Sequence, residues 1–397
     1  MKALIIGSGI AGPTTAMALR KAGIDSVVYE AHPGGADNVG VFLTLGSNGI
    51  DALRTIGADA PAIAAGFATP AIDMVSTTGK ALGQVRTSRP DGDITSRTLK
   101  RADLYRAIHD EALRRGIRFE HGKRLVDAQD SGDGVRARFA DGTEEYGDLL
   151  IGCDGIHSTV RGIIDPAAPA PSYSGLIGLG GYTRGVPVDS RTGSYRMMFG
   201  KRAFFGYVPA PDGEVWWFAN LPRPAEPAPG ELENIGSEQW RSELVDLFAE
   251  DTGPAAALIR ASQVITPAGP MHAMPALPAW HRGRLIAIGD AAHAPSPTSG
   301  QGASLSVEDA VELAKALRDQ PTVEGAFAAY EAVRRPRVER IVKQAARINN
   351  NKAAGPAGRI IRDLLMPLVL PRLANGEQSR QTYGHHIDWD QAHRPSA

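Results

Sequence analysis

Residues 1–30 read MKALIIGSGIAGPTTAMALRKAGIDSVVYE, and this stretch decides the fold of the N-terminal region. Ala3–Ile6 is a short, wholly apolar run, which is typical of a parallel strand covered on both faces. The sequence GSGIAG follows at residues 7–12, and Pro13–Ala22 then has the pattern of a helix. A second apolar run, Ser26–Tyr29, ends in the carboxylate of Glu30. The stretch therefore predicts a strand, a glycine turn, a helix and a second strand that ends in an acid.

This arrangement is typical of a unit that binds a dinucleotide. Gly7 permits the tight turn, Gly9 lets a pyrophosphate approach the backbone, and Gly12 lets the helix pack closely on the strand. The amides at the helix start stabilise phosphate charge, and Glu30 lies where a carboxylate hydrogen-bonds the ribose hydroxyls of an adenosine. Glu30 argues against a bound 2′-phosphate, but the unit leaves FAD and NAD open. A glycine-rich turn without any ligand is the alternative explanation.

The composition excludes several other classes of protein. The 397 residues include 43 Lys plus Arg and 44 Asp plus Glu, so a net charge of -1 gives no overall attraction for nucleic acid. The only cysteine, Cys153, excludes an internal disulfide and a cysteine-based zinc site, and we expect no metal. No apolar run reaches the roughly 18 residues of a spanning helix, and the N-terminal run lacks a signal-peptide cleavage site. We therefore expect a cytoplasmic protein.

Further along the chain, the hydrophobic periodicity predicts both helices and strands. A hairpin is predicted over Pro70–Arg89, and turn-separated strands rich in aromatic residues run from Ser172 to Pro222 as an antiparallel meander. Helices are predicted over Arg101–Arg114, Glu238–Phe248, Val307–Leu317 and Val323–Lys352. The expected fold class is α/β, with a Rossmann-like nucleotide-binding domain, an interleaved antiparallel sheet and C-terminal helices.

A second motif follows the apolar strand Arg284–Gly289, which delivers Asp290 at its carboxyl end. The sequence AAHAPSPTSGQGA then continues to Ala303 and leads into a helix. A carboxylate at this place can accept a hydrogen bond from a ribityl hydroxyl. The Gly-Gln-Gly turn leaves free amides at a helix start, where they stabilise negative charge on the N1–C2 edge of a reduced flavin. Taken alone, Asp290 is also explained as an ordinary helix N-cap.

Three stretches together resemble the signatures of the single-component FAD-dependent aromatic hydroxylases, which have the para-hydroxybenzoate hydroxylase fold. They are GSGIAG with VYE, IGCDGIHSTVR at residues 151–161, and GRLIAIGDAAHAPSPTSGQGASLSVEDA at residues 283–310. KRADLYRAI, at residues 100–108, resembles the R-x-x-L helix of that family. The resemblance is strongest to the compact branch that includes salicylate, urate and 3-hydroxybenzoate hydroxylases and tetracycline-inactivating monooxygenases.

The resemblance implies a domain organisation and a reaction. It implies an FAD-binding domain over residues 1–69, 98–171 and 269–345, a substrate-binding domain over 70–97 and 172–268, and a bridging C-terminal helical segment over 346–397. NADH or NADPH would reduce FAD, and O2 would form a flavin C4a-hydroperoxide that hydroxylates or epoxidises an aromatic or polycyclic small molecule. The enzyme would be a monomer or homodimer, without stable membrane insertion. A flavoprotein reductase or dehydrogenase acting on an isoprenoid-like substrate, and a non-catalytic flavin-binding protein, are the alternatives.

The resemblance also implies which residues contact the cofactors. They are Gly7, Gly9, Ile10, Ala11, Gly12, Glu30, Arg101, Asp154, Gly155, Gly289, Asp290, Pro297, Gly300, Gln301, Gly302 and Ala303. Asp154 and Gly155 belong to a stretch implicated in both FAD and NAD(P)H binding, and Arg161 completes its pattern. The candidates for substrate contacts are Arg202, Phe205, Tyr207, Trp216 and Pro297. Since side chains alternate along a strand, about half of those on the meander are expected to face the core instead.

Several other residues are expected to have structural or solvent-exposed roles. His293 is expected in a structural hydrogen bond, and His385 and His386 at the surface. The basic run Arg334, Arg335, Arg337, Arg340, Lys343 and Arg347 is interpreted as a solvated helix face. The apolar segment Ile360–Leu373, which two prolines interrupt, is predicted to bridge the domains or cover the substrate pocket rather than lie on a membrane.

Overall fold

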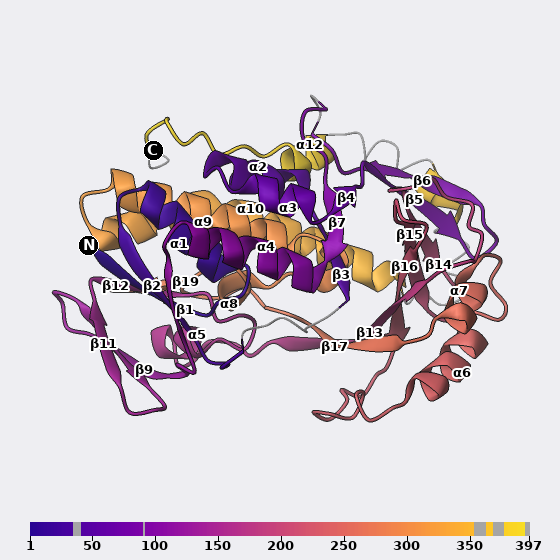
Figure 1. Cartoon of the computed structure of the whole chain (residues 1–397), viewed down its shortest axis with the longest axis horizontal. Coiled ribbons are helices and arrows are strands. Elements are labelled where there is room, and N and C mark those ends of the chain that lie inside the picture. The colour runs from indigo at the N-terminus through magenta and orange to yellow at the C-terminus, as the bar shows by residue number, and fades with distance from the viewer. Residues whose placement is uncertain (35–40, 90–91, 353–362, 368–376, 394–397) are drawn as a thin grey trace.

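A computed structural model of the chain describes residues 1–34, 41–89, 92–352, 363–367 and 377–393. Figure 1 shows a layered part built on a parallel sheet at one end and a large second sheet at the other. The long strands β13 (Ser172–Thr183) and β17 (Ile265–Ala273) run from the second sheet toward the parallel-sheet part (Figure 1). The glycine turn and the Asp290 motif lie in the parallel-sheet part, and the strands rich in aromatic residues lie in the second sheet.

The parallel sheet carries the predicted nucleotide unit. Ile5 pairs with Val28 on one side and with Ile151 on the other, so the apolar runs form the centre of the sheet. Neighbouring strands of this sheet pair in parallel, except that the short edge strand His281–Arg282 pairs antiparallel with the strand next to it. The order across the sheet is β18 (His281–Arg282), β19 (Leu285–Ala287), β12 (Leu149–Gly152), β1 (Lys2–Ile6), β2 (Asp25–Glu30) and β8 (Arg118–His121).

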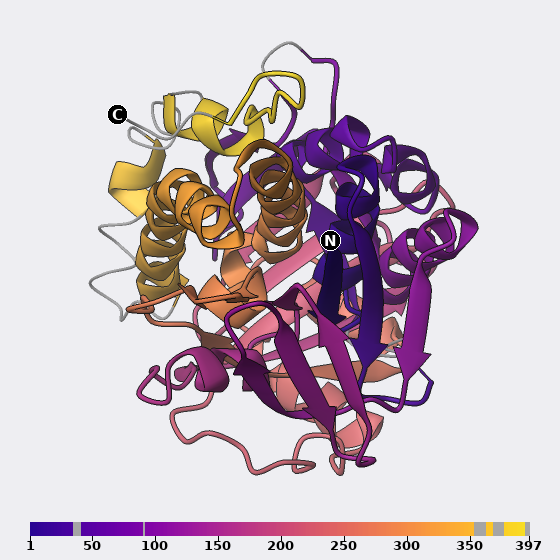
Figure 2. The same ribbon diagram turned by 90° about the vertical axis from the view of Figure 1, so that its left-hand side faces the viewer.

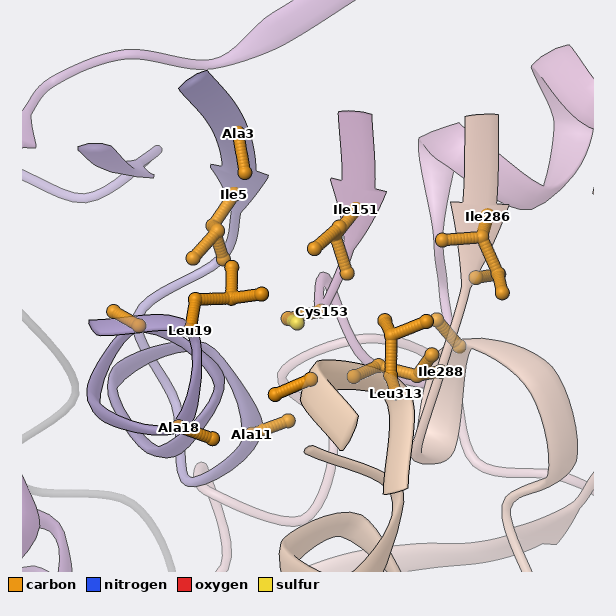
Figure 3. Close-up of a cluster of buried hydrophobic side chains, with 14 of the residues drawn as sticks. Ala3, Ile5, Ala11, Ala18, Leu19, Ile151, Cys153, Ile286, Ile288 and Leu313 are labelled. Atoms are coloured by element: carbon orange, nitrogen blue, oxygen red, sulfur yellow. The ribbon is translucent and has the colours of Figure 1, made fainter. Parts of the chain in front are cut away.

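Helices cover one face of this sheet, and a three-stranded sheet covers the other (Figures 1 and 2). Cys153 follows β12 in the core between them, among aliphatic side chains (Figure 3), and is 7% exposed. The cysteine therefore serves as a small buried side chain. The helices of this part of the molecule are α1 (Ala11–Lys21), α2 (Ser47–Thr55), α3 (Asp59–Ala64), α4 (Arg101–Arg114), α5 (Thr159–Ile164), α8 (Asp290–His293), α9 (Gly302–Asp319) and α10 (Val323–Lys352). The small sheets are β9 (Leu125–Asp130), β10 (Val135–Phe139) and β11 (Glu144–Gly147), and β3 (Phe42–Leu45), β4 (Phe67–Ala68) and β7 (Arg97–Lys100). Of the helices, α5 contacts β9 and lies on the face of the three-stranded sheet (Figure 1).

The second large sheet contains the predicted meander and hairpin. Its neighbours are antiparallel except one pair, in which the strand of Met197 runs parallel to that of Met74 and joins the hairpin to the meander. Its order is β17 (Ile265–Ala273), β13 (Ser172–Thr183), β16 (Val215–Pro222), β15 (Phe204–Pro209), β14 (Tyr195–Phe199), β5 (Ala71–Ser76) and β6 (Ala81–Arg86). The predicted α/β fold class is confirmed, and β17 extends beyond the expected boundary at residue 268.

The two faces of this sheet have different partners. On one face, Phe205, Tyr207 and Trp217 pack against Trp240 and Phe248 of the helical region α6 (Ser237–Leu247) and α7 (Ala255–Ala261), which the sequence predicted only in part. On the other face, aromatic side chains of the sheet pack against Phe42 and Phe67 of the small β3-β7-β4 sheet. We call this second set the aromatic layer, and it comprises Tyr182, Tyr195, Trp216 and Phe218.

The basic run of α10 is only in part the solvated face that the sequence predicted: Arg340 and Lys343 are exposed, but two other arginines are not. Arg334 is fully buried and Arg337 is 8% exposed, because both guanidinium groups pair with Glu308 of α9. The run of basic residues did not predict the burial of these two side chains, because their acidic partners lie on another helix, α9. Arg335, in contrast, is half-buried and pairs with Glu331 on its own helix.

The C-terminal segment lies beside α9 and α10 (Figure 2) and includes α12 (Glu377–Tyr383). His386 is half-exposed, in line with a surface position, and its Nδ1–H donates a 2.7 Å hydrogen bond to Oδ2 of Asp51. His385 was also expected at the surface, but it is half-buried, near the charged groups of Glu308, Arg334 and Arg337. Most of Ile360–Leu373 lies outside the described residues; Met366 packs on the large sheet near Phe199 and Phe204.

Among the described residues, no helix combines the length and the apolar character that crossing a membrane requires.

Candidate functional site

Four of the predicted stretches meet at one edge of the parallel sheet. The glycine turn follows β1, Glu30 ends β2, Asp154 follows β12 and Asp290 follows β19. These strands are neighbours in the order β19-β12-β1-β2, and their carboxyl ends therefore lie side by side. Ligands of open α/β sheets bind outside the carboxyl ends of the strands, so this edge is the candidate site.

The glycine turn has room at one position and none at the two others. Gly7 has a φ of 101°, and a Cβ there would lie 2.5 Å from the carbonyl oxygen of Cys153. A Cβ at Gly12 would lie 1.9 Å from the carbonyl oxygen of Gly7, whereas a Cβ at Gly9 would meet no described atom within 4 Å. Ile10 is the N-cap of α1 and Ala11 its first residue, and this helix start has no side-chain cap among the described residues. The turn thus combines close packing with an open face in front of free helix amides.

Glu30 is held against this turn. Its Oε2 accepts a 2.8 Å hydrogen bond from the backbone N–H of Ser8, and its Oε1 accepts one of 2.8 Å from the N–H of His32. The side chain is 8% exposed. Since each carboxylate oxygen can accept more than one hydrogen bond, both retain capacity for ribose hydroxyls.

Asp290 has an unused carboxylate. It is the first residue of α8 and makes no hydrogen bond with any described residue, so the N-cap explanation does not hold for it. A Cβ at Gly302, the first residue of α9, would lie 3.6 Å from its Oδ1. Burial raises the pKa of Asp290, and His293 and Arg101 act in the opposite direction. A half-buried acceptor without a partner indicates a ligand donor, since buried polar groups are normally paired.

The backbone beside Asp290 is fixed from α9. Gly289 has a φ of 59°, and its N–H donates a 2.8 Å hydrogen bond to Oδ2 of Asp309. The same oxygen lies 2.5 Å from Nε2 of His293. The structural hydrogen bond predicted for His293 is therefore present, and it helps to orient the turn that carries Asp290.

Asp154 mainly serves its own loop. Its Oδ1 accepts a 2.5 Å hydrogen bond from the hydroxyl of Ser158, and its Oδ2 accepts from the N–H groups of Thr159 and Val160 at the start of α5. Burial raises the pKa of Asp154.

The residues around Asp154 tie its loop to the rest of the edge. Arg161 donates to the carbonyl oxygens of Ala291 and Ile156 at 3.0 and 2.8 Å, which joins the loop to α8. Gly155 has a φ of 74° and open space beside it. The structure thus places this loop at the site, but the carboxylate of Asp154 already has partners.

The Gly-Gln-Gly turn lies at the start of α9. Pro297 and Gly300 are exposed, and Gly300 has a φ of 62°. Gln301 is 3% exposed and is the N-cap of α9, which Gly302 and Ala303 begin without a side-chain cap among the described residues. The first amides of α9 are therefore available, whereas the N–H groups of Gly300 and Gln301 already donate to Pro297 and Ser299.

Sequence reasoning missed Asn48, which supports this turn. Its Nδ2 donates to Oε1 of Gln301 at 3.0 Å and to Oε1 of Glu308 at 2.6 Å. Its buried Oδ1 has no partner in the part of the chain that the structure describes. A Cβ at Gly46 would lie 2.4 Å from that oxygen, so glycine is required there. The sequence Gly-Ser-Asn-Gly at residues 46–49, directly after a short apolar strand, could have indicated that Asn48 lies at a turn near the site.

The candidates for substrate contacts are divided between the two faces of the large sheet. Trp216 belongs to the aromatic layer and faces the β3 region. Phe205 and Tyr207 lie on the opposite face, against α6 and α7. Arg202 is half-exposed and pairs with Asp246 at 2.8 Å. The structure therefore brings Trp216 and Pro297 toward the candidate site and not the other three.

The family of the chain follows from a match to known proteins. A sequence profile of the FAD binding domain matches residues 1–345. The chain therefore belongs to the FAD binding domain family and is an FAD-dependent monooxygenase of the compact aromatic-hydroxylase branch.

Particular relatives cover most of its length. It is 32% identical over 359 residues to an aurachin C monooxygenase/isomerase of Stigmatella aurantiaca, which covers 87% of this chain and 88% of that protein. It is 30% identical over 352 residues to an FAD-dependent urate hydroxylase of Klebsiella pneumoniae, with 87% and 88% covered. The crystal structure of HpxO from Klebsiella pneumoniae, complexed with FAD and uric acid, is similar with a TM-score of 0.83, 27% identity and 96% of each chain covered.

The residues at the edge fit FAD. The open space at Gly9, beside the amides of α1, would accommodate a pyrophosphate, and Glu30 has acceptor capacity for the adenosine ribose. Asp290 offers an unpaired acceptor for the ribityl chain, and Oδ1 of Asn48 an unpaired acceptor beside Gln301. These open or unpaired positions follow one another along the edge, as the parts of an extended dinucleotide would.

Proposed function

We propose that the enzyme inserts one atom of O2 into an aromatic or polycyclic small molecule, by hydroxylation or epoxidation, with NADH or NADPH as the electron donor. The observation that carries this proposal is the aromatic layer, which faces the strand and loops around the flavin site. An extended apolar wall of this kind suits a flat, electron-rich substrate.

The aromatic layer is centred on Phe42 of β3. The ring centroids of Tyr182, Tyr195, Trp216 and Phe218 lie 6.3, 6.4, 5.5 and 6.2 Å from that of Phe42. The hydroxyl of Tyr182 donates to the carbonyl oxygen of Val41 at 3.0 Å, which fixes the layer to the strand that leads to Gly46 and Asn48. Because it is bonded to this strand, the aromatic layer would form a continuous apolar wall beside the flavin site.

Phe218 is the residue of this layer that we assign most directly to substrate contact. It is half-buried, while Trp216 on the same strand is 8% exposed and packs between Phe42 and Phe67. A Cβ at Gly206 on the neighbouring strand would lie 2.4 Å from the Phe218 ring, so glycine leaves the space that this ring occupies. Phe218 and Met197 would line the pocket, and Trp216 would hold the wall in place.

Bound FAD, once reduced, supplies the activation of O2. The chain's part is to exclude water and to orient the substrate over the flavin, so no protein nucleophile is required. The amides at the start of α9 would stabilise negative charge on the reduced flavin. Arg101, Asp290 and Gly289 would hold the ribityl and phosphate region, with Pro297, Gly300 and Ala303 at the border of the ring. The Asp154–Gly155 loop would serve the nucleotides mainly through its backbone.

The experiment is a screen of aromatic and polycyclic phenols against the FAD-loaded enzyme with NADH and with NADPH. We expect some compounds to accelerate NAD(P)H oxidation, because binding against the wall brings the substrate to the flavin. A Phe218→Ala variant, used as a site-specific control, should respond with a higher half-saturating concentration. If neither nicotinamide nucleotide reduces the bound flavin with any compound, the proposed electron donor is wrong.

A cytoplasmic location and a monomeric or homodimeric state stay predictions from the sequence.

A further inference from the structure

A buried cluster of charges lies behind the flavin site. Glu308 is fully buried, and its carboxylate accepts hydrogen bonds from Arg334 at 2.6 Å and from two nitrogens of Arg337 at 2.8 and 2.7 Å. Arg334 also donates to Asp309 at 2.8 Å. Burial alone would raise the pKa of Glu308, but Arg337 and Arg334 hold it well below its usual range. Two acids and two guanidinium groups thus form a neutral set in the core, which we call the buried quartet.

The buried quartet is connected to both flavin-binding turns. Through Asn48, Glu308 is bonded to Gln301 at the Gly-Gln-Gly turn. Through its Oδ2, Asp309 accepts the N–H of Gly289 beside Asp290. The positions of the ring-side turn and the ribityl-side turn therefore depend on the same four side chains.

The C-terminal residues close this network from the other side. We define residues 381–387 as the C-terminal strap. Arg337 donates to the carbonyl oxygens of Gln381 and Thr382 at 2.5 and 3.0 Å. The hydroxyl of Ser47 donates to the carbonyl oxygen of Tyr383 at 2.7 Å. The strap is thus bonded both to the buried quartet and to the start of α2.

Tyr383 returns from the strap to the flavin turn. Its side chain is half-buried; burial raises the pKa of its hydroxyl, and a hydrogen bond with the side chain of Gln301 acts in the opposite direction. The contacts form a closed ring that runs from Tyr383 through Gln301, Asn48, Glu308 and Arg337 to the carbonyl groups of the strap. The side chain of Gln301 is therefore hydrogen-bonded by both Asn48 and Tyr383.

We propose that the C-terminal strap is a positioning element for the flavin, and that Tyr383 is the positioning residue that fixes Gln301 and the start of α9. It acts through the first amides of α9, those of Gly302 and Ala303, which stabilise negative charge on the reduced flavin more than on the oxidised one. The inference rests on the flavin site of the proposed function but not on oxygen insertion. Loosening the strap should therefore weaken binding of reduced FAD more than binding of oxidised FAD.

The test uses two variants that cut the ring at different points, each with a matched control. Tyr383→Phe removes only the hydroxyl, and Arg337→Lys keeps the charge but loses the fork that reaches the strap. Tyr173→Phe removes a hydroxyl that bonds the carbonyl oxygen of Arg223 in the large sheet, and Arg335→Lys alters a half-buried arginine of the same helix. The flavin midpoint potential and the dissociation constant of oxidised FAD are measured without substrate and without oxygen.

We expect Tyr383→Phe to retain oxidised FAD within about threefold, and to lower the relative affinity for reduced FAD by threefold or more. Arg337→Lys should lower the affinity for reduced FAD, relative to that for oxidised FAD, about tenfold. For a two-electron couple this makes the midpoint potential about 30 mV more negative. Trypsin should cut at Arg380 faster in Arg337→Lys, because the strap is released. Both controls should match the parent protein.

An unchanged potential in folded Tyr383→Phe would overturn the proposal, as would an equal change in the control variants. If Arg337→Lys does not fold, Tyr383→Phe decides alone, since it leaves the buried quartet intact. A protein that binds FAD but oxygenates nothing would still give a clear result here. The two proposals can therefore fail independently.

Discussion

At the scale of single residues, Asp290 is the clearest functional assignment. Its carboxylate is half-buried and unpaired among the described residues, next to the start of α9. We predict that Asp290→Asn weakens FAD binding roughly 10- to 150-fold, the equivalent of a charge-assisted hydrogen bond of about 1.5–3 kcal/mol. The apoprotein should be no less stable, because burial already disfavours the charged form. Fluorescence titration with FAD measures the effect, and a dissociation constant within twofold of the parent would contradict the assignment.

Two glycines of the same turn allow packing to be separated from binding. We predict that Gly12→Ala lowers the free energy of unfolding of the apoprotein by about 3 kcal/mol, because its Cβ would overlap the carbonyl oxygen of Gly7. Gly9→Ala should leave that free energy within about 0.5 kcal/mol but weaken FAD binding, since the methyl group occupies the open space. Urea unfolding and FAD titration of both variants check this. Equal effects of the two substitutions on unfolding would show that the space at Gly9 is not reserved for a ligand.

At the scale of elements, local sequence patterns predicted the helices and strands well. The predicted range Arg101–Arg114 coincides with α4, and Val323–Lys352 with α10. Arg101–Arg114 has a clear apolar periodicity, which depends only on neighbouring residues, and Val323–Lys352 is rich in the helix-forming residues Ala, Glu, Arg and Lys. The face that each strand of the large sheet presents was less predictable. Phe205 and Trp216 have similar chemistry, and only the register of β15 against β16 places them on opposite sides.

The two faces of the large sheet give a matched pair of variants. Phe205 is fully buried against the helical region, so Phe205→Ala should lower the free energy of unfolding by about 3–5 kcal/mol and leave KM unchanged. Phe218→Ala should raise KM at least severalfold with a smaller loss of stability, because this half-buried ring is assigned to the pocket wall. Thermal unfolding and steady-state kinetics on an active compound measure both. A raised KM in Phe205→Ala alone would reverse the assignment of the two faces.

His385 links the C-terminal segment to the pH dependence of stability. Burial lowers its pKa from 6.5 to about 4, and the nearby Arg337 and Arg334 act in the same direction while Glu308 opposes them. The folded protein therefore prefers the neutral ring. Its contribution is complete above about pH 6.5, decreases as the pH falls toward 4, and amounts to at most about 3 kcal/mol.

We predict that His385→Gln shows a smaller loss of stability than the parent protein between pH 6.5 and 4, since it has no ring to protonate. Urea unfolding at several pH values gives the difference between the two proteins, in which the titration of other groups cancels. His121→Gln, at an exposed position, serves as the control. Parallel stability curves for His385→Gln and the parent would exclude this role for His385.

At the scale of the whole molecule, the sequence predicted which stretches meet but not what lies behind them. Parallel strands bring their carboxyl ends to one edge, so the grouping of Gly9, Glu30 and Asp290 follows from the motifs. The buried quartet and the strap depend on contacts between distant parts of the chain. Asn48 and Glu308, for example, are 260 positions apart, and neither has a local pattern that indicates its partner. Long-range polar contacts of this kind require the structure.

The central claim is that this chain uses FAD and O2 to oxygenate an aromatic or polycyclic molecule held against the aromatic layer. The most direct measurement is mass spectrometry of the product formed from a compound that accelerates NAD(P)H oxidation, with the reaction run under 18O2. We predict that the product gains one labelled oxygen atom from the gas and none from labelled water. Consumption of NAD(P)H without labelled product, for every accelerating compound, would contradict the claim, and reduction of a substrate double bond without labelling would replace oxygenation with a reductase reaction.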